Sequence, residues 1–163
     1  MKNLPEIDTK IFTLPDLLSR INQWRQLGKT IAFTNGCFDI LHEGHIYSLS
    51  QAASEADYLI VGVNADASVK KLKGKSRPIN NEHSRSRLLA SLMLVDAVII
   101  FKEDTPLDLI KSLLPDVLVK GGDYKVDEIA GAKEVIENGG RVVINPILQG
   151  FSTTSIIDKM KED

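Results

Sequence analysis

Short apolar runs of strand length alternate about five times with segments of helical periodicity, and this alternation constrains the fold of the 163-residue chain more than any other feature. The run from Tyr58 to Val63 is nearly continuous, as expected for a parallel strand covered on both faces. The alternation predicts an α/β fold: a doubly wound, Rossmann-like, five-stranded parallel sheet with helices on both faces. The expected strands are residues 30–34, 58–63, 97–101, 117–120 and 142–145.

The helical segments are marked by their ends. Thr13 is the expected N-cap of the first helix and Gly28 its end. Later helices are expected at 44–56, 82–93, 106–114, 128–138 and 152–160. The basic segment 65–81 is expected to be a long loop without regular structure, and such loops are usually functional or mobile.

The length fits a single domain over residues 1–163, with a lead-in and helix at 1–28 and the core at 29–163. A net charge of −2 argues against a general nucleic-acid binder, and no apolar run is long enough to span a membrane. Residues 1–10 carry charges of both signs and no apolar core, so we do not expect a signal peptide. Cys37 is the only cysteine, which excludes an internal disulfide and fits a cytoplasmic protein.

Two histidines follow the first expected strand, His42 and His45, and a helix is expected to begin between them at Gly44. The free N–H groups and the dipole of a helix N-terminus favour an anion, so imidazole donors placed there suit a phosphate. Gly44 would leave room for a phosphate or a base. An incidental surface pair and a metal site, with Cys37 or Asp39 as third ligand, are the alternatives. The position after a strand favours phosphate chemistry, and we assign no metal ligands.

Three other segments are expected at the same edge of the sheet, where the parallel strands end. The lysines around Lys73 form either a solvated run or a mobile phosphate clamp. The segment 150–154 is either a plain N-cap at Ser152 or an anion-binding turn with hydroxyl donors. The segment 120–124 is either a tight turn or a close backbone contact with a ligand. Arg85 is either an ordinary surface residue or a residue that reaches back to phosphates.

These segments resemble a known family. Residues 34–45, Thr-Asn-Gly-Cys-Phe-Asp-Ile-Leu-His-Glu-Gly-His, are similar to the HxGH signature of the cytidylyltransferase-like nucleotidyltransferases, and 150–157 resemble its second signature. Val119–Tyr124 and Ile129–Gly131 resemble the heptose 1-phosphate adenylyltransferase branch. Further segments that resemble this branch are 73–80, 95–96, 103–106, 114–118 and 137–140.

The resemblance implies that AMP passes from ATP to D-glycero-D-manno-heptose 1-phosphate by direct attack at the α-phosphorus, with Mg²⁺ on the triphosphate. It implies catalytic roles for His42, His45 and Lys73. It implies nucleotide contacts for Asn35, Gly36, Cys37, Phe38, Gly44, Gly150, Ser152, Thr153 and Thr154. Acceptor or ribose contacts are expected for Asp39, Lys120, Gly121, Asp123 and Arg85.

Two departures from the family patterns keep alternatives open. Ile147-Leu148 stand where the glycerol-3-phosphate cytidylyltransferases have Arg-Thr, which weakens a reading with CTP. The heptose enzyme is often fused to a sugar kinase, whereas we expect no kinase within these 163 residues. A sibling enzyme with another nucleotide or acceptor, and a nucleotide-binding module without turnover, are the rival functions. A homodimer is the expected assembly, and the amphipathic segment 14–27 is either its contact or a helix packed on its own domain.

Overall fold

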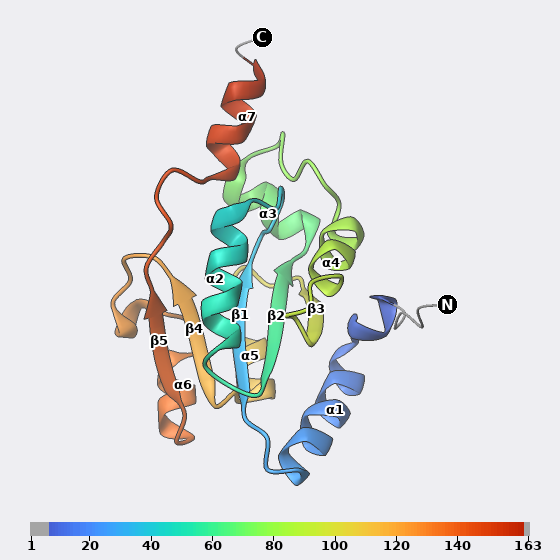
Figure 1. The fold of residues 1–163 in the computed structure, drawn as a ribbon, viewed down its shortest axis with the longest axis vertical. Coiled ribbons are helices and arrows are strands. Elements are labelled where there is room, and N and C mark those ends of the chain that lie inside the picture. Colours follow the sequence, from blue (N-terminus) through green and yellow to red (C-terminus); the bar gives the residue numbers. More distant parts are fainter. Residues whose placement is uncertain (1–6, 162–163) are drawn as a thin grey trace.

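The computed structural model describes residues 7–161 and contains one five-stranded, all-parallel sheet. The strands are β1 (Ile31–Gly36), β2 (Tyr58–Asn64), β3 (Ala97–Phe101), β4 (Val117–Gly121) and β5 (Arg141–Asn145). Their order is β3-β2-β1-β4-β5, so the chain winds outward in both directions from β1 (Figure 1). The prediction of a doubly wound parallel sheet is confirmed, and each strand lies within two residues of its expected bounds.

Helices cover both faces of this sheet, as predicted. The α-helices are α1 (Leu14–Gln26), α2 (Glu43–Ala53), α3 (Asp66–Lys73), α4 (Glu82–Ala90), α5 (Leu107–Leu113), α6 (Ala132–Glu137) and α7 (Thr153–Lys161). One core cluster joins α1, α5 and α6 to the sheet, and the other joins α2 and α4. Neighbouring residues of β1 serve opposite clusters: Phe33 belongs to the first and Ala32 to the second. The strands are therefore buried on both faces, which explains their apolar runs.

The apolar face of α1 is used within the chain. Leu17 and Ile21 are almost fully buried, and the Trp24 ring stacks on Tyr58 at 4.2 Å. Thr13 accepts a hydrogen bond from the Asp16 backbone N–H, as expected of an N-cap. Of the two readings of the segment 14–27, packing on its own domain is the correct one, so its apolar face is not free to form a dimer contact.

The expectation of an irregular loop over 65–81 is wrong for its first half, which forms α3. Val69 is fully buried, and the Asn64 side chain donates to Ser68 Oγ at 3.1 Å. Three lysines of this segment, Lys70, Lys71 and Lys73, fall in the last turn of α3, where positive charge is favourable to the helix dipole. The helix is short, and long-range packing rather than a long apolar repeat stabilises it.

The helix expected at 128–138 is interrupted. A short 3-10 turn, η2 (Val126–Glu128), precedes α6, and Gly131 lies between them at φ +85°. A Cβ at Gly131 would stand 2.6 Å from Ile110, so close packing against α5 requires this glycine. The expected irregular lead-in at 1–12 contains a 3-10 turn, η1 (Ile7–Lys10), and its first six residues lie outside those the structure describes. No described helix has the length and hydrophobicity to cross a membrane.

Candidate active site

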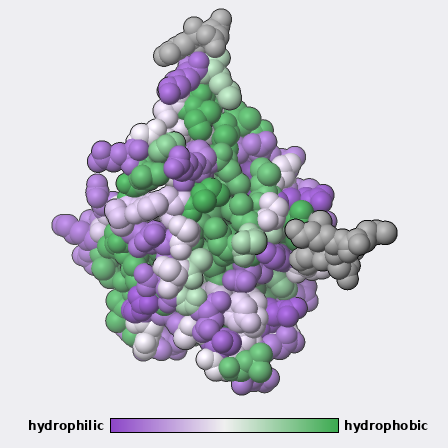
Figure 2. Space-filling view, in the orientation of Figure 1, coloured by the Kyte–Doolittle hydropathy of each residue, from purple (hydrophilic) through white to green (hydrophobic). Residues whose placement is uncertain are grey.

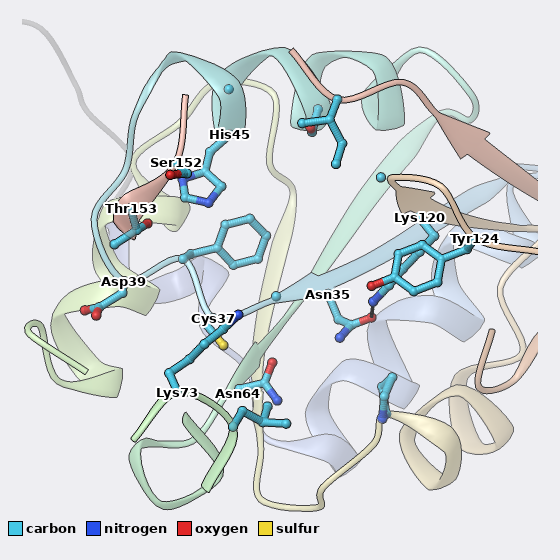
Figure 3. Close-up of a pocket in the computed structure, with 18 of the residues that line it drawn as sticks. Asn35, Cys37, Asp39, His45, Asn64, Lys73, Lys120, Tyr124, Ser152 and Thr153 are labelled. Atoms are coloured by element: carbon cyan, nitrogen blue, oxygen red, sulfur yellow. Dashed lines mark hydrogen bonds between the residues drawn. The ribbon is translucent and has the colours of Figure 1, made fainter. Parts of the chain in front are cut away.

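A cavity of about 660 Å³ opens at the carboxyl edge of the sheet. The strand order reverses between β1 and β4, and the cavity lies beyond the ends of these two strands. In open parallel sheets this is the usual ligand site, because loops diverge there to opposite faces. Figure 3 shows His45, Ser152 and Thr153 on one side of the cavity and Lys120 and Tyr124 on the other.

The turn from β1 to α2 forms one wall. Phe38 has a left-handed backbone, with φ +48°, and its ring is 8% exposed. The ring covers Gly36, where a Cβ would stand 3.0 Å from it, and lies 5.2 Å from the His45 ring between centroids. A left-handed non-glycine residue is strained and persists only where its surroundings hold it. The turn is therefore fixed by packing.

The two histidines stand at the beginning of α2, as predicted. His42 is the N-cap residue by backbone conformation, and its ring stacks on His45 with centroids 3.8 Å apart. Neither Nδ1 atom has a hydrogen-bond partner among the described residues. Buried polar groups are normally satisfied, so two such atoms beside a cavity indicate a place for polar ligand atoms.

Both imidazoles are held neutral. Burial lowers the pKa of His42. The pKa of His45 falls to about 4, because of burial first and the adjacent His42 second, while the nearby Ile40 backbone opposes the fall. At neutral pH each ring is an uncharged donor and acceptor, and an anionic ligand would raise both pKa values.

Gly44 lines the cavity, and a side chain there would also crowd its neighbours. A Cβ there would stand 3.1 Å from the His42 ring and 3.1 Å from Cβ of Phe151. The absence of a side chain at Gly44 thus allows the His42 ring and Phe151 to approach the start of α2 closely.

Lys120 occupies the opposite wall, at the end of β4. Its Nζ donates to Asn35 Oδ1 at 3.4 Å and lies 5.7 Å from the centre of the Tyr124 ring. It has no ion-pair partner within the described part of the chain, and burial lowers its pKa. A partly buried cation without a carboxylate partner gains stability when an anion binds beside it.

Lys73 lines the cavity from the last turn of α3, as the clamp reading requires. Cys37 lies opposite it on the β1–α2 turn. Burial raises the pKa of the Cys37 thiol, while the nearby charges of Lys73 and Arg85 oppose the rise. The thiol is therefore protonated at neutral pH, and it fits a small packing residue rather than a nucleophile.

The hydroxyl turn, residues 150–154, closes the cavity from the C-terminal side. Ser152 Oγ accepts from the Ser155 backbone N–H at 3.0 Å, so Ser152 caps α7 as predicted. Thr153 Oγ1 donates to the Ile40 carbonyl at 3.5 Å. Ser152, Thr153 and Thr154 line the cavity, whereas Gly150 does not.

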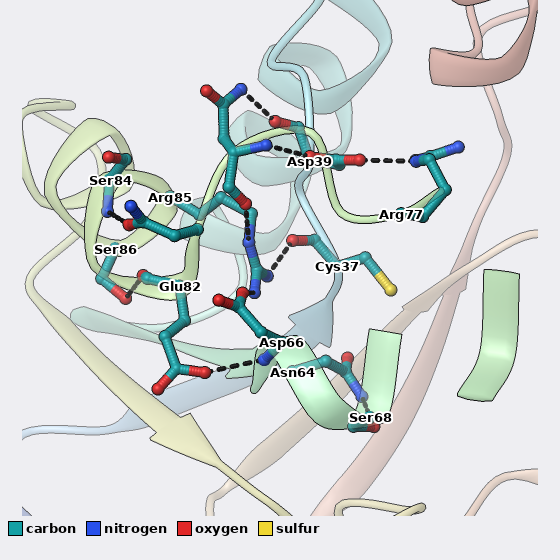
Figure 4. Close-up of polar contacts among 12 residues, drawn as sticks. Cys37, Asp39, Asn64, Asp66, Ser68, Arg77, Glu82, Ser84, Arg85 and Ser86 are labelled. Carbon is teal, nitrogen blue, oxygen red and sulfur yellow. Dashed lines mark hydrogen bonds and ion pairs between the residues drawn. The ribbon is translucent and has the colours of Figure 1, made fainter. Parts of the chain in front are cut away.

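Three expected site residues lie outside the cavity lining: Gly150, Asp123 and Arg85. Asp123 is exposed on the turn after β4. The reading of Arg85 as a surface residue is wrong, because its side chain is fully buried and donates to Cys37, Asn80 and Asp66 (Figure 4). Direct contact with a substrate is not available to it.

Asp39 lines the cavity with its oxygens already engaged. The Arg77 side chain and the backbone N–H groups of Ile79 and Asn80 donate to its carboxylate at 2.5 to 2.9 Å. Burial raises the pKa of Asp39, but these bonds outweigh burial and the net shift is downward. In this structure Asp39 fixes the segment 77–80 instead of offering free oxygens to an acceptor or a metal.

The sequence also missed some lining residues, among them Ser48, Thr105 and Ile147. Thr105 follows β3 in the chain, so the strand end was the available signal. Ser48 lies one turn of α2 beyond Gly44. Ile147 stands where the glycerol-3-phosphate cytidylyltransferases have arginine, and that position was the available signal.

A metal held by the protein alone does not fit these residues. The described chain contains no group of three or more His, Cys, Asp or Glu placed to hold an ion. Of the acidic residues at the cavity, Asp104 pairs with Lys71 at 2.9 Å and Asp39 is engaged as above. A divalent cation would depend on oxygens that a ligand brings.

The family model described as "Cytidylyltransferase-like" matches residues 33–159, which contain every segment of this cavity. The chain belongs to the cytidylyltransferase-like family. It is accordingly a nucleotidyltransferase, and the resemblance drawn from its motifs is confirmed.

Curated relatives of this cytidylyltransferase-like chain are named "Bifunctional protein HldE". The protein from Rhodospirillum rubrum is 53% identical over 153 residues, which cover 94% of this chain and 31% of the relative. The protein from Koribacter versatilis is 51% identical over 158 residues, covering 97% and 32%. The chain thus spans about a third of the length of these relatives.

Two solved structures share the fold of this family member. The lipopolysaccharide core biosynthesis protein of Thermoplasma volcanium is 34% identical with a TM-score of 0.61, covering 74% of this chain and 98% of that one. The pantoate-beta-alanine ligase of Francisella tularensis has a TM-score of 0.59 at 16% identity, covering 94% and 78%. The second likeness concerns the fold alone.

Proposed function

We propose that this nucleotidyltransferase transfers AMP from ATP to D-glycero-D-manno-heptose 1-phosphate, giving ADP-heptose and pyrophosphate. The observation that carries the proposal is one cavity that joins the neutral histidine pair to the Lys120 corner. The segments Val119–Tyr124 and Ile129–Gly131, whose sequences resemble the heptose branch, contribute Lys120, Tyr124 and Ile129 to its lining. The HldE relatives support the same assignment.

In this reaction a phosphate oxygen of the acceptor attacks the α-phosphorus of ATP. A new P–O bond forms as the bond from the α-phosphorus to the β-phosphate bridging oxygen breaks, and pyrophosphate leaves with that electron pair. The attacking oxygen is already anionic, so no base has to remove a proton from it. Such transfers depend on positioning and charge stabilisation.

The histidine pair suits the crowded α-phosphoryl group. Each neutral ring can donate one N–H at the N-terminus of α2, where the helix dipole adds positive potential. Charge that develops on the phosphoryl oxygens would strengthen these hydrogen bonds in the transition state.

The remaining groups divide between the two reactants. Ser152, Thr153 and Thr154 would bind the β- and γ-phosphates, with Lys73 closing on them from α3. Asn35, Gly36 and Phe38 would contact the nucleotide along the β1–α2 turn. Lys120 would neutralise the acceptor phosphate, with Gly121 allowing its close approach.

Mg²⁺ is part of the proposal as a companion of ATP. When bound it neutralises phosphate charge, and its ligands would be mainly phosphate oxygens and water, because the protein supplies no acidic set for it. A homodimer and a cytoplasmic location are also proposed. Light scattering on the purified chain tests the dimer, and twice the monomer mass is expected.

The test of function is pyrophosphate release from purified protein with Mg²⁺. Each of four nucleoside triphosphates is paired with both heptose 1-phosphate anomers and with glycerol 3-phosphate. Release only with ATP and a heptose 1-phosphate supports the proposal and identifies the anomer. Release with CTP and another acceptor would reassign the substrates, and tight nucleotide binding without any release would favour a binding module.

A further inference from the structure

Arg85 is a fully buried arginine whose guanidinium joins three separate segments. Its Nη1 donates to the Cys37 carbonyl at 2.6 Å, its Nε to the Asn80 carbonyl at 2.9 Å, and its Nη2 to the Asp66 carboxylate at 2.8 Å (Figure 4). Burying a cation is costly unless it is fully hydrogen-bonded. Because its side chain has no exposed surface, Arg85 can act only through the groups that it holds.

The first of these groups is the β1–α2 turn. Cys37 lies between Gly36 and Phe38, which both line the cavity, and Phe38 has the strained left-handed backbone. The Asn80 side chain holds the Asp39 carbonyl at 2.7 Å, and Arg85 in turn holds the Asn80 carbonyl. The strained turn is thus held at two carbonyls by one connected network.

The second group is the start of α3. Asp66 is its first residue, bonded through its side chain to Arg85 and through its backbone N–H to Glu82. Lys73 is the last residue of the same helix and lines the cavity. Arg85 therefore fixes the helix that presents Lys73 and the turn that faces it.

We propose that Arg85 is a positioning residue for the nucleotide: by holding the Cys37 carbonyl and the Asp66 carboxylate together, it sets the distance between the β1–α2 turn and Lys73 that a bound triphosphate requires. This inference rests on the proposed nucleotide chemistry. A lysine at this position keeps the charge, but its single nitrogen cannot reproduce the planar fork that reaches three acceptors.

The experiment is calorimetric titration of MgATP into the wild-type chain, Arg85→Lys and the control Arg87→Lys. Arg87 lies on the same helix, is half exposed and pairs with Asp8 at 3.2 Å. Loss of bonds to a charged group predicts a Kd about tenfold higher for Arg85→Lys, and an unchanged Kd for Arg87→Lys. A mere loss of folded protein would lower the binding stoichiometry and leave Kd unchanged. In turnover assays the KM of the acceptor should stay within about twofold of wild type.

An unchanged Kd in folded Arg85→Lys overturns the inference and leaves the proposed function standing. Absence of binding by the wild-type chain, with ATP and with the three other triphosphates, overturns both. If Arg85→Lys does not unfold cooperatively, Asp66→Asn replaces it, because Asp66 lies outside the cavity lining and is partly exposed. A Kd about threefold higher for Asp66→Asn then supports the inference, on the scale of one weakened charged bond, and an unchanged Kd overturns it.

Discussion

The β1–α2 turn and the hydroxyl turn at 150–154 face the same cavity but are anchored very differently. The first is tied to the body by buried bonds to the Cys37 and Asp39 carbonyls and to the Asp39 carboxylate. The second leads into α7, which has no buried residue and projects beyond the sheet edge (Figure 1). Its one described side-chain bond to the body of the chain is the contact from Thr153 to Ile40, at 3.5 Å.

The surface near the hydroxyl turn is partly hydrophobic. Hydrophobic residues gather below the base of α7 on the face seen in Figure 2. Phe151 and Leu72 are exposed hydrophobic residues that line the cavity. The two walls therefore differ in how firmly the described chain holds them. The histidine wall is fixed by packing and hydrogen bonds within the described chain. We propose that the hydroxyl wall becomes ordered only when it binds phosphates.

The largest effect is expected at the prearranged wall. His45→Ala removes a donor to transition-state charge, so kcat should fall by about 10²- to 10³-fold, the loss typical of one such donor, while MgATP affinity changes little. Stopped-flow pyrophosphate release and calorimetry measure the two quantities. His83→Ala, an exposed histidine on α4, is the control. An unchanged kcat in His45→Ala would refute the role of His45.

The two walls should also differ in how much they contribute to the free energy of unfolding. Asp39→Asn weakens buried bonds to a carboxylate, and we expect the free energy of unfolding to fall by about 2 kcal/mol. Ser152→Ala removes only the cap of a helix without buried residues, so global unfolding should shift by less than about 0.5 kcal/mol. Urea unfolding measures both. Equal losses in the two variants would mean that the walls are anchored alike.

Lys73→Ala tests whether the clamp acts on both the bound and the reacting nucleotide. Loss of a charge-assisted contact of about 1.4 kcal/mol would raise Kd about tenfold and lower kcat by a similar factor. Lys133→Ala, exposed on α6, should change neither. A silent Lys73→Ala would move the clamp to Lys70, Lys71 or Lys75.

The stability of the histidine wall should also depend on pH. The pKa of His45 is about 4 in the folded chain and near 6.5 when unfolded, so the unfolded state binds more protons between these values. The free energy of unfolding should therefore fall as the pH drops from about 6.5 to 4, and show no contribution from His45 above that window. Urea unfolding across this pH range should show that the free energy of unfolding depends less steeply on pH in His45→Gln than in the wild type. Equal pH dependences would mean that another group titrates.

Much of the fold followed from the sequence because its signals are local. Apolar runs marked the strands, Thr13 and Ser152 marked helix starts, and the segment 42–45 gave the histidine pair at the start of α2. The convergence of the strand ends on one edge also followed, since parallel strands end together.

What the sequence did not reveal depends on contacts far apart in the chain. Arg85 is 48 residues from Cys37, and its burial depends on the three acceptors that meet around it. Asp39 is likewise engaged by residues about 40 positions away. The short α3 lacks a long apolar repeat, and Asp123 turns outward at a tight turn whose direction no local pattern reports.

In the proposed reaction the histidine wall and the hydroxyl wall hold ATP, Lys120 holds the acceptor, and a single direct displacement joins the two. The most direct measurement is the stereochemistry at the α-phosphorus, using one diastereomer of ATPαS with heptose 1-phosphate and determining the product configuration by ³¹P NMR. We predict inversion. Retention would require two displacements through a covalent nucleotidyl-enzyme, with His45 or Cys37 as nucleophile, and would contradict the account.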